Sequence, residues 1–199
     1  MFINTDIKFY FFTDTLNEII TKNIKNFKKL SFIYKSNSIN GINHTNIITI
    51  KKFCKKNKIP FFISDNFKLA KKYAADGIFL SSSYKKIGNI IINKRNFKII
   101  GSAHNQLEYS LKSKQLCEMI MLSPLFYNKK YSHNKILNVC KFNLISMNWE
   151  RKICALGGIN LNNLKKLNMT RSLSAAFISL MEHNSQKKSP LTISSKRAF

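Results

Sequence analysis

Short apolar runs alternate with amphipathic stretches along most of the chain. The runs lack polar–apolar alternation, which is typical of strands buried on both faces of a parallel sheet. Eight such strands are predicted, at 8–13, 30–34, 59–63, 77–80, 97–100, 118–122, 152–156 and 175–180. Helical spacing of apolar residues predicts helices near 16–24, 45–56, 69–73, 107–111, 136–147 and 161–167, while 87–92 is either an irregular link or a short helix.

The segment 59–84 is the clearest unit, a strand, a helix and a second strand. The connection is short, so the two strands are predicted to be parallel. Asp65 follows directly after the first strand, where parallel α/β folds handle ligands. Asp65 is therefore a candidate site residue, although it could equally serve only as the N-cap of the next helix.

Eight strand–helix repeats predict the α/β class and a single (β/α)8 TIM barrel. An open doubly wound sheet is the alternative, but no GxGxxG follows the first strand, so a dinucleotide site has no support. The barrel is assigned to 1–184, and the Ser/Lys-rich segment 185–199 is expected to be a flexible basic tail.

If the barrel is right, the strand ends gather on one face and form a polar ring. Barrels commonly bind phosphate at the loops after their seventh and eighth strands. Gly157 and Gly158 follow the seventh predicted strand, and Ser179 lies at the end of the eighth. Two glycines after a buried strand also suggest that backbone approaches something closely.

The chain carries 34 basic and 9 acidic residues, a formal net charge of +25. Its lysines are spread along the whole sequence and no nucleic-acid motif is present, which disfavours nucleic acid as a partner and is compatible with small phosphorylated ligands. The four cysteines form no CxxC or Cys/His cluster, so zinc is not expected. No long apolar run or signal-peptide pattern occurs. We therefore expect a cytoplasmic protein without a membrane segment, with a homo-oligomer as one option for its assembly.

Five motifs in order resemble the family of thiamine phosphate synthase and its TenI relatives. They are FYFFTD at 9–14, IPFFISDNFKLAKKYAADGIFLSSS at 59–83, IIGSAHN at 99–105, MLSPLF at 121–126 and CALGGIN at 154–160. Each motif alone is weak, but five at suitable spacing are hard to obtain by chance. The resemblance covers most of the chain, from Phe9 to about Leu180, and itself implies the barrel.

The resemblance implies a transferase of thiamine biosynthesis. The family's synthase joins hydroxymethylpyrimidine pyrophosphate to thiazole phosphate and releases pyrophosphate, with Mg²⁺ and cationic side chains stabilising the leaving group. Matching positions then suggest roles as follows: catalytic for Lys35, Ser102, His104 and Lys130 (or its neighbour Lys129); phosphate binding for Gly157, Gly158 and Ser179; substrate binding for Ser64 and Asn37; metal binding for Asp65.

The match is uneven where it concerns the metal and the charges. The family's second metal-binding aspartate has no counterpart, because Ser81, Ser82, Ser83 and Tyr84 occupy that stretch. Phe79 stands where the family has histidine, and Asn37 replaces a cationic residue. The sequence thus predicts an Mg²⁺ site with one carboxylate missing.

Three hypotheses follow. The first is a thiamine phosphate synthase. The second is a TenI-like thiazole tautomerase or phosphate-ligand binder without coupling activity, in which His104 would be the general acid/base. The third and least favoured is a basic nucleic-acid-binding module.

Overall fold

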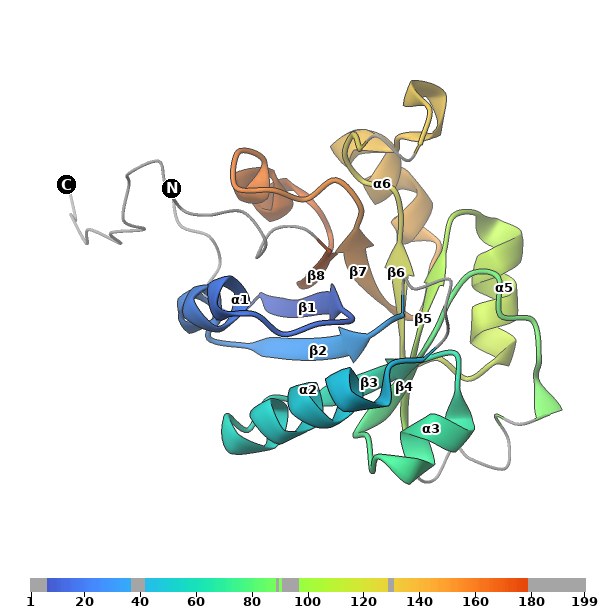
Figure 1. Ribbon diagram of the computed structural model, residues 1–199. Coiled ribbons are helices and arrows are strands. Elements are labelled where there is room, and N and C mark those ends of the chain that lie inside the picture. Colours follow the sequence, from blue (N-terminus) through green and yellow to red (C-terminus); the bar gives the residue numbers. More distant parts are fainter. Residues whose placement is uncertain (1–6, 37–41, 89, 91–96, 129–130, 179–199) are drawn as a thin grey trace.

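We describe a computed structural model of the chain, which covers residues 7–36, 42–88, 90, 97–128 and 131–178. Its framework is eight strands, β1 to β8, separated mostly by helices (Figure 1). The strands are β1 (Lys8–Thr13), β2 (Leu30–Tyr34), β3 (Phe61–Ser64), β4 (Gly77–Leu80), β5 (Lys98–Ala103), β6 (Met119–Leu122), β7 (Lys152–Leu156) and β8 (Ser174–Phe177).

The strands close into a parallel barrel in chain order, with β8 paired to β1. Closure confirms the predicted (β/α)8 barrel and rules out the open doubly wound sheet, which has two edges. In the part of the chain described here, no helix has both the length and the apolar character needed to cross a membrane.

Alternate residues of each strand point to opposite sides of the barrel wall. Odd and even positions of β1 show this, because Phe9 and Phe11 belong to the outer apolar cluster and Tyr10 and Phe12 to the inner one. The inner cluster fills the barrel with side chains from all eight strands, namely Tyr10, Phe12, Ile33, Phe62, Phe79, Ile100, Met119, Met121, Cys154 and Ala176. The absence of alternation in the sequence is thus explained, since both faces are apolar.

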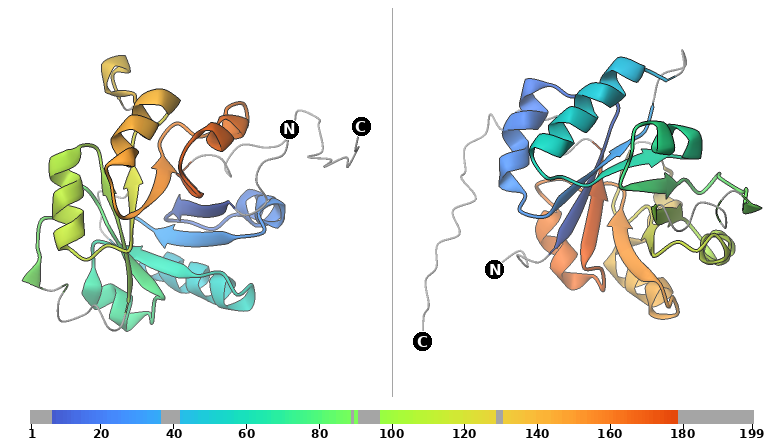
Figure 2. Two further views of the ribbon diagram at one scale, coloured as in Figure 1. Left: turned by 180° about the vertical axis from the view of Figure 1, so that it is seen from behind. Right: turned by 90° about the horizontal axis from the view of Figure 1, so that it is seen from below.

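Helices surround the strands on the outside, as two further views also show (Figure 2). They are α1 (Glu18–Asn23), α2 (His44–Lys56), α3 (Phe67–Lys72), α5 (Gln106–Lys114) and α6 (Asn138–Met147), with the 3₁₀ helices η1 (Ile24–Asn26), η3 (His133–Lys135) and η4 (Leu164–Met169). In the link after β4, Gly88 and Ile90 are helical, and much of the remainder lies outside the described residues.

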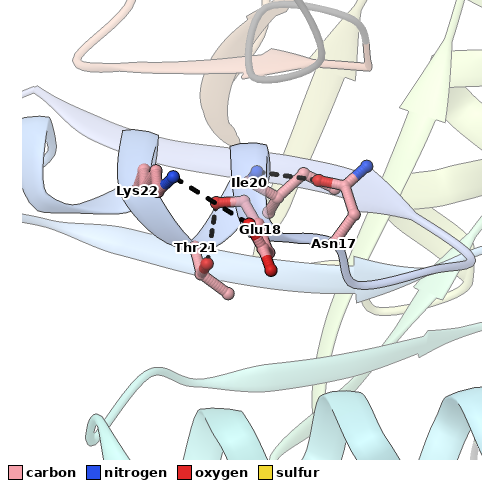
Figure 3. Close-up of polar contacts among 5 residues, drawn as sticks. All are labelled: Asn17, Glu18, Ile20, Thr21 and Lys22. Carbon is pink, nitrogen blue, oxygen red and sulfur yellow. Dashed lines mark hydrogen bonds and ion pairs between the residues drawn. The ribbon is translucent and has the colours of Figure 1, made fainter.

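Helix α1 shows how local sequence sets a helix start (Figure 3). The Asn17 side chain accepts a hydrogen bond from the Ile20 N–H at 2.9 Å, as an N-cap does. Ile20 lies on the buried face of the helix. Glu18 and Lys22 form an exposed ion pair at 3.9 Å. An exposed pair contributes little, so the cap and the buried apolar face define this helix.

The segment predicted as a helix at 161–167 is instead a 3₁₀ helix that begins at Leu164. The Asn160 side chain binds N–H groups that a helix leaves free at its start, so it caps this segment. The turns that follow are of the 3₁₀ type, with the Lys166 N–H donating to the Asn163 carbonyl at 2.9 Å. The Asn160 side-chain oxygen accepts from the N–H groups of Asn162 and Asn163, at 3.0 and 3.2 Å, and Asn163 Nδ2 donates to the Gly158 carbonyl at 2.7 Å.

Several strand boundaries also differ from the prediction, and that of β5 affects the site. β5 extends to Ala103 rather than ending at Ile100, because Gly101, Ser102 and Ala103 continue the pairing with β6. Ser102, expected in the loop after the strand, therefore lies within it. β8 ends at Phe177, and the predicted residues Ser179 and Leu180 lie outside the described part.

Candidate functional site

A polar layer lies above the apolar interior of the barrel, at the carboxyl ends of the strands. In six strands, the residue two positions after the last inner residue lies on the same side of the barrel wall. In chain order these residues are Asp14, Lys35, Ser64, Ser81, Ser102 and Ser123. Ser102 and Ser123 are buried, and Lys35, Ser64 and Ser81 are half-buried. These positions bring hydroxyl, carboxylate and ammonium groups to one face, where barrel enzymes place their sites.

Asp65 connects the ends of β3 and β4. Its backbone takes the left-handed conformation, with φ of 56°, and its N–H donates to the Phe79 carbonyl at 2.8 Å. One carboxylate oxygen accepts from the Ser81 N–H at 2.7 Å, and the other accepts from the Ser64 hydroxyl at 3.0 Å. Asp65 is not the N-cap of α3. Asn66 is the cap, because its side chain accepts from the Leu69 N–H at 3.0 Å.

The serine-rich stretch after β4 begins at this carboxylate. Ser81 Oγ lies 2.9 Å from Ser83 Oγ, so these two hydroxyls face each other. The Tyr84 ring does not join them, because it packs against the outer core cluster, with its centroid 6.4 Å from that of Phe67. The stretch 81–84 thus presents hydroxyl groups and an aromatic ring turned toward the core.

Phe79 fills the barrel interior instead of lining the site. It is 2% exposed, and its ring centroid lies 4.9 Å from that of Phe12 in an edge-to-face arrangement. Such contacts favour an apolar residue at this position.

His104 has a defined orientation above β5. Its Nδ1 lies 2.9 Å from the Ser123 carbonyl oxygen and 3.0 Å from Ser123 Oγ, while its backbone N–H donates to a Glu108 carboxylate oxygen at 2.7 Å. The tilted ring of Tyr131 lies 5.7 Å away, centroid to centroid. A carbonyl only accepts, so Nδ1 carries a proton in this arrangement and Nε2 is the nitrogen left for other contacts.

The glycine pair after β7 packs against the segment that follows β6. A Cβ atom on Gly157 would lie 2.9 Å from Pro124 Cα, and one on Gly158 would lie 2.3 Å from the Phe126 carbonyl oxygen. Both glycines have positive φ, +94° and +70°. The close backbone approach that the sequence suggested is therefore seen between these glycines and the segment after β6. Backbone hydrogen bonds from Leu125 to Leu156 and from Phe126 to Gly157 hold the two segments together.

Three of the predicted site residues, Asn37, Lys130 and Ser179, lie outside the described residues, as does Lys129. The structure gathers the other predicted residues at the same end of the barrel. Asp14 and Ser123 share this face; the sequence placed both in the predicted polar ring but gave neither a specific role. The signal for both was present, since each directly follows a predicted strand.

A hollow of about 220 Å³ adjoins Asp65, between the ends of β2 and β3. Its walls include Tyr34, Ser64, Asp65 and Asn66. Within the described ranges, no group of three or more His, Cys, Asp or Glu residues is placed to hold a metal.

Known proteins resemble this chain in sequence. The family model for thiamine monophosphate synthase matches residues 18–182. The thiamine-phosphate synthase of Pelagibacter ubique is 32% identical over 201 residues, covering 94% of this chain and 87% of that protein. The thiamine-phosphate synthase of Mannheimia succiniciproducens is 28% identical over 137 residues, covering 67% of this chain and 62% of its own length. The match thus spans about three-fifths of the latter relative.

Solved structures support the fold. The thiamine phosphate pyrophosphorylase of Pyrococcus furiosus superposes with a TM-score of 0.67 at 18% identity, covering 88% of this chain and 87% of that one. The 3-hexulose-6-phosphate synthase of Salmonella typhimurium gives 0.66 at 10% identity, covering 90% and 92%. Identities this low concern architecture alone. The family is established by sequence, through the model and the Pelagibacter relative: the chain belongs to the thiamine monophosphate synthase family.

Proposed function

We propose that this chain is a thiamine phosphate synthase, which couples hydroxymethylpyrimidine pyrophosphate to thiazole phosphate and releases pyrophosphate. Membership of the family, together with the synthase name of the curated relatives described above, is the observation that carries the proposal. The same names favour coupling over isomerisation of the thiazole alone. The substrates would be small and phosphorylated, which suits a chain of formal net charge +25.

The chemistry requires stabilisation of a departing pyrophosphate and accurate placement of the thiazole nitrogen. In our proposal Lys35 supplies positive charge at the end of β2, and Ser102 and Ser64 supply hydroxyl groups near the pyrophosphate. Gly157 and Gly158 offer backbone N–H groups for the thiazole phosphate. Lys130, Asn37 and Ser179 retain the roles that the family resemblance gives them.

His104 contributes through its Nε2 atom. With Nδ1–H donating to the Ser123 carbonyl, Nε2 is directed away from that carbonyl. When protonated, Nε2 donates to an anionic oxygen of the substrate, and when neutral it accepts. Its fixed ring orientation makes this contact directional.

Mg²⁺ fits the residues present only with help from the substrate. Asp65 supplies one carboxylate, and each of its oxygens, although already accepting one hydrogen bond, retains a lone pair. Mg²⁺ is commonly held by one or two carboxylates plus substrate phosphates. Asp65 would therefore hold the ion together with pyrophosphate oxygens, and the bound ion would neutralise charge on the leaving group.

The direct test mixes the purified chain with both substrates and Mg²⁺ and measures thiamine phosphate by chromatography. We expect product with the wild type and a loss of at least tenfold in kcat/KM for Asp65→Asn. Glu18→Gln is the matched control, because the Glu18 side chain is 92% exposed on α1. A folded wild-type protein that yields no thiamine phosphate at high enzyme concentration refutes the coupling reaction.

A parallel assay of thiazole isomerisation separates the second hypothesis. Isomerisation that His104→Ala abolishes, in the absence of any coupling, would instead identify a TenI-like tautomerase. Oligomeric state and a cytoplasmic location remain predictions.

A further inference from the structure

A lysine is buried behind the site, on the helix that follows β5. Lys112 of α5 is 0% exposed, and so is Gln115, which directly follows the end of the helix. Charged side chains are seldom buried completely unless they are paired. Among the described residues, no carboxylate forms an ion pair with Lys112 within 4.0 Å.

The Lys112 ammonium binds backbone instead. Its Nζ donates to the Tyr84 carbonyl at 3.0 Å and to Gln115 Oε1 at 2.9 Å. Gln115 Nε2 donates to the carbonyls of Tyr84 and Lys86, each at 3.0 Å. The stem of Lys112 crosses Gly101 of β5, where a Cβ atom would lie 2.9 Å from Lys112 Cδ.

These contacts fasten the segment 81–86, which we call the β4 strap. Its first residue is held at the Asp65 carboxylate, through the Ser81 N–H at 2.7 Å. Its later residues are held at Lys112 and Gln115. Ser83, whose hydroxyl lies 2.9 Å from that of Ser81, is between the two attachments. The strap therefore has both ends fixed and carries hydroxyl groups at the edge of the candidate site.

The ammonium is not required to satisfy the strap carbonyls. Without it, the Tyr84 and Lys86 carbonyls would keep their bonds from Gln115. Burial lowers the pKa of Lys112 to about 8, with the charge of Lys85 acting in the same direction and Asp65 and Glu108 opposing it. Burying an ammonium without a paired carboxylate costs free energy, so this charge is a weak source of stability. A role in orientation explains its presence better than a role in folding.

We propose that Lys112 is a positioning residue, which fixes the β4 strap so that the Ser81 and Ser83 hydroxyls are placed to bind the pyrophosphate group of the substrate. The proposal rests on the proposed function, because it names the group that the strap would hold. Lys112 itself contacts no substrate and acts through the Tyr84 carbonyl.

The test compares Lys112→Met, which keeps the apolar stem and removes the donor, with Lys114→Met, which changes an exposed lysine of the same helix. For Lys112→Met we expect KM for the pyrophosphate substrate to rise at least threefold with kcat within twofold. Amide hydrogen exchange within 81–86 should accelerate at least fivefold, while the melting temperature stays equal or increases. Lys114→Met should match the wild type in all of these measurements.

Unchanged KM for Lys112→Met overturns the proposal, even if exchange in the strap accelerates. If Lys112→Met does not fold, Gln115→Met, which removes the bonds to Tyr84 and Lys86, is held to the same criteria. If the wild type shows no coupling activity, the proposed function fails separately, and calorimetry with inorganic pyrophosphate and Mg²⁺ decides about the strap. Binding at least threefold weaker in Lys112→Met then supports the positioning role, and equal binding, or no binding to the wild type, overturns it.

Discussion

Replacement of Gly158 by alanine should destabilise the barrel strongly. The new Cβ would lie 2.3 Å from the Phe126 carbonyl oxygen, 2.5 Å from the Phe126 carbonyl carbon and 2.5 Å from the Tyr127 carbonyl oxygen. All three are backbone atoms, so no flexible side chain can move aside. Gly158 also has φ of +70°, a region that L-residues with a Cβ adopt at a cost.

The size of the effect follows from two contributions. A left-handed conformation costs a residue with a Cβ about 1–2 kcal/mol. Forcing extra volume into a packed region typically costs about 1–3 kcal/mol, because the segment 124–127 must shift. A loss of about 3 kcal/mol in the free energy of unfolding is therefore expected. For a chain of this length, that corresponds to a fall of about 6–12 °C in melting temperature.

Calorimetry on Gly158→Ala and Gly88→Ala measures the difference. Gly88 is the matched control, because it is helical and exposed and a Cβ there would meet no heavy atom within 4 Å. Gly88→Ala should be neutral or more stable by up to about 1 kcal/mol. If Gly158→Ala melts within about 1 °C of the wild type, the reasoning from close approach is refuted. Reduced activity in Gly158→Ala would not by itself demonstrate phosphate binding, since the same change displaces the segment after β6.

Three other measurements test the packing and the buried groups. Phe79→Ala should lower the free energy of unfolding by about 3–5 kcal/mol in urea denaturation, because it empties part of the barrel interior, and a loss below about 1 kcal/mol would contradict that placement. The free energy of unfolding should rise as pH increases from about 8 to 10.5, the ordinary pKa of lysine. Over this range the folded protein releases the Lys112 proton while the unfolded chain keeps it. The gain is on the order of 3 kcal/mol relative to Lys112→Met, and parallel pH profiles for the two proteins would count against it. Cys140 is exposed, whereas burial raises the pKa of the other three thiols, Cys54, Cys117 and Cys154, to about 12. A thiol reagent should therefore label one cysteine in the native protein and four in urea. Rapid labelling of more than one cysteine in the native protein would be inconsistent with the structure.

The order and type of most elements could be predicted because they depend on local sequence. Apolar runs buried on both sides became strands, and helices such as α2 and α5 began at asparagine caps beside apolar faces. The 3₁₀ form of the helix at Leu164 was missed because apolar spacing over so short a segment does not distinguish a 3₁₀ helix from an α-helix.

The candidate site was predictable as a set of positions but not as a set of contacts. Asp65 could be located at a strand end from sequence, yet only the fold showed that Asn66 caps α3 while Asp65 binds the Ser81 N–H. The tie to Ser81 crosses from β3 to β4, and its geometry depends on the register of the two strands.

By itself, the sequence determined the succession of eight strands with intervening helices, the polar residues at the strand ends and the family resemblance. Each of these depends only on local residue patterns or on the order of short motifs. Tertiary structure alone decided that Gly157 and Gly158 pack against the segment after β6, that Tyr84 turns toward the core and that Lys112 is buried against the β4 strap. Those outcomes depend on which segments meet when the barrel closes, and residues far apart in the chain carry no local signal of that meeting.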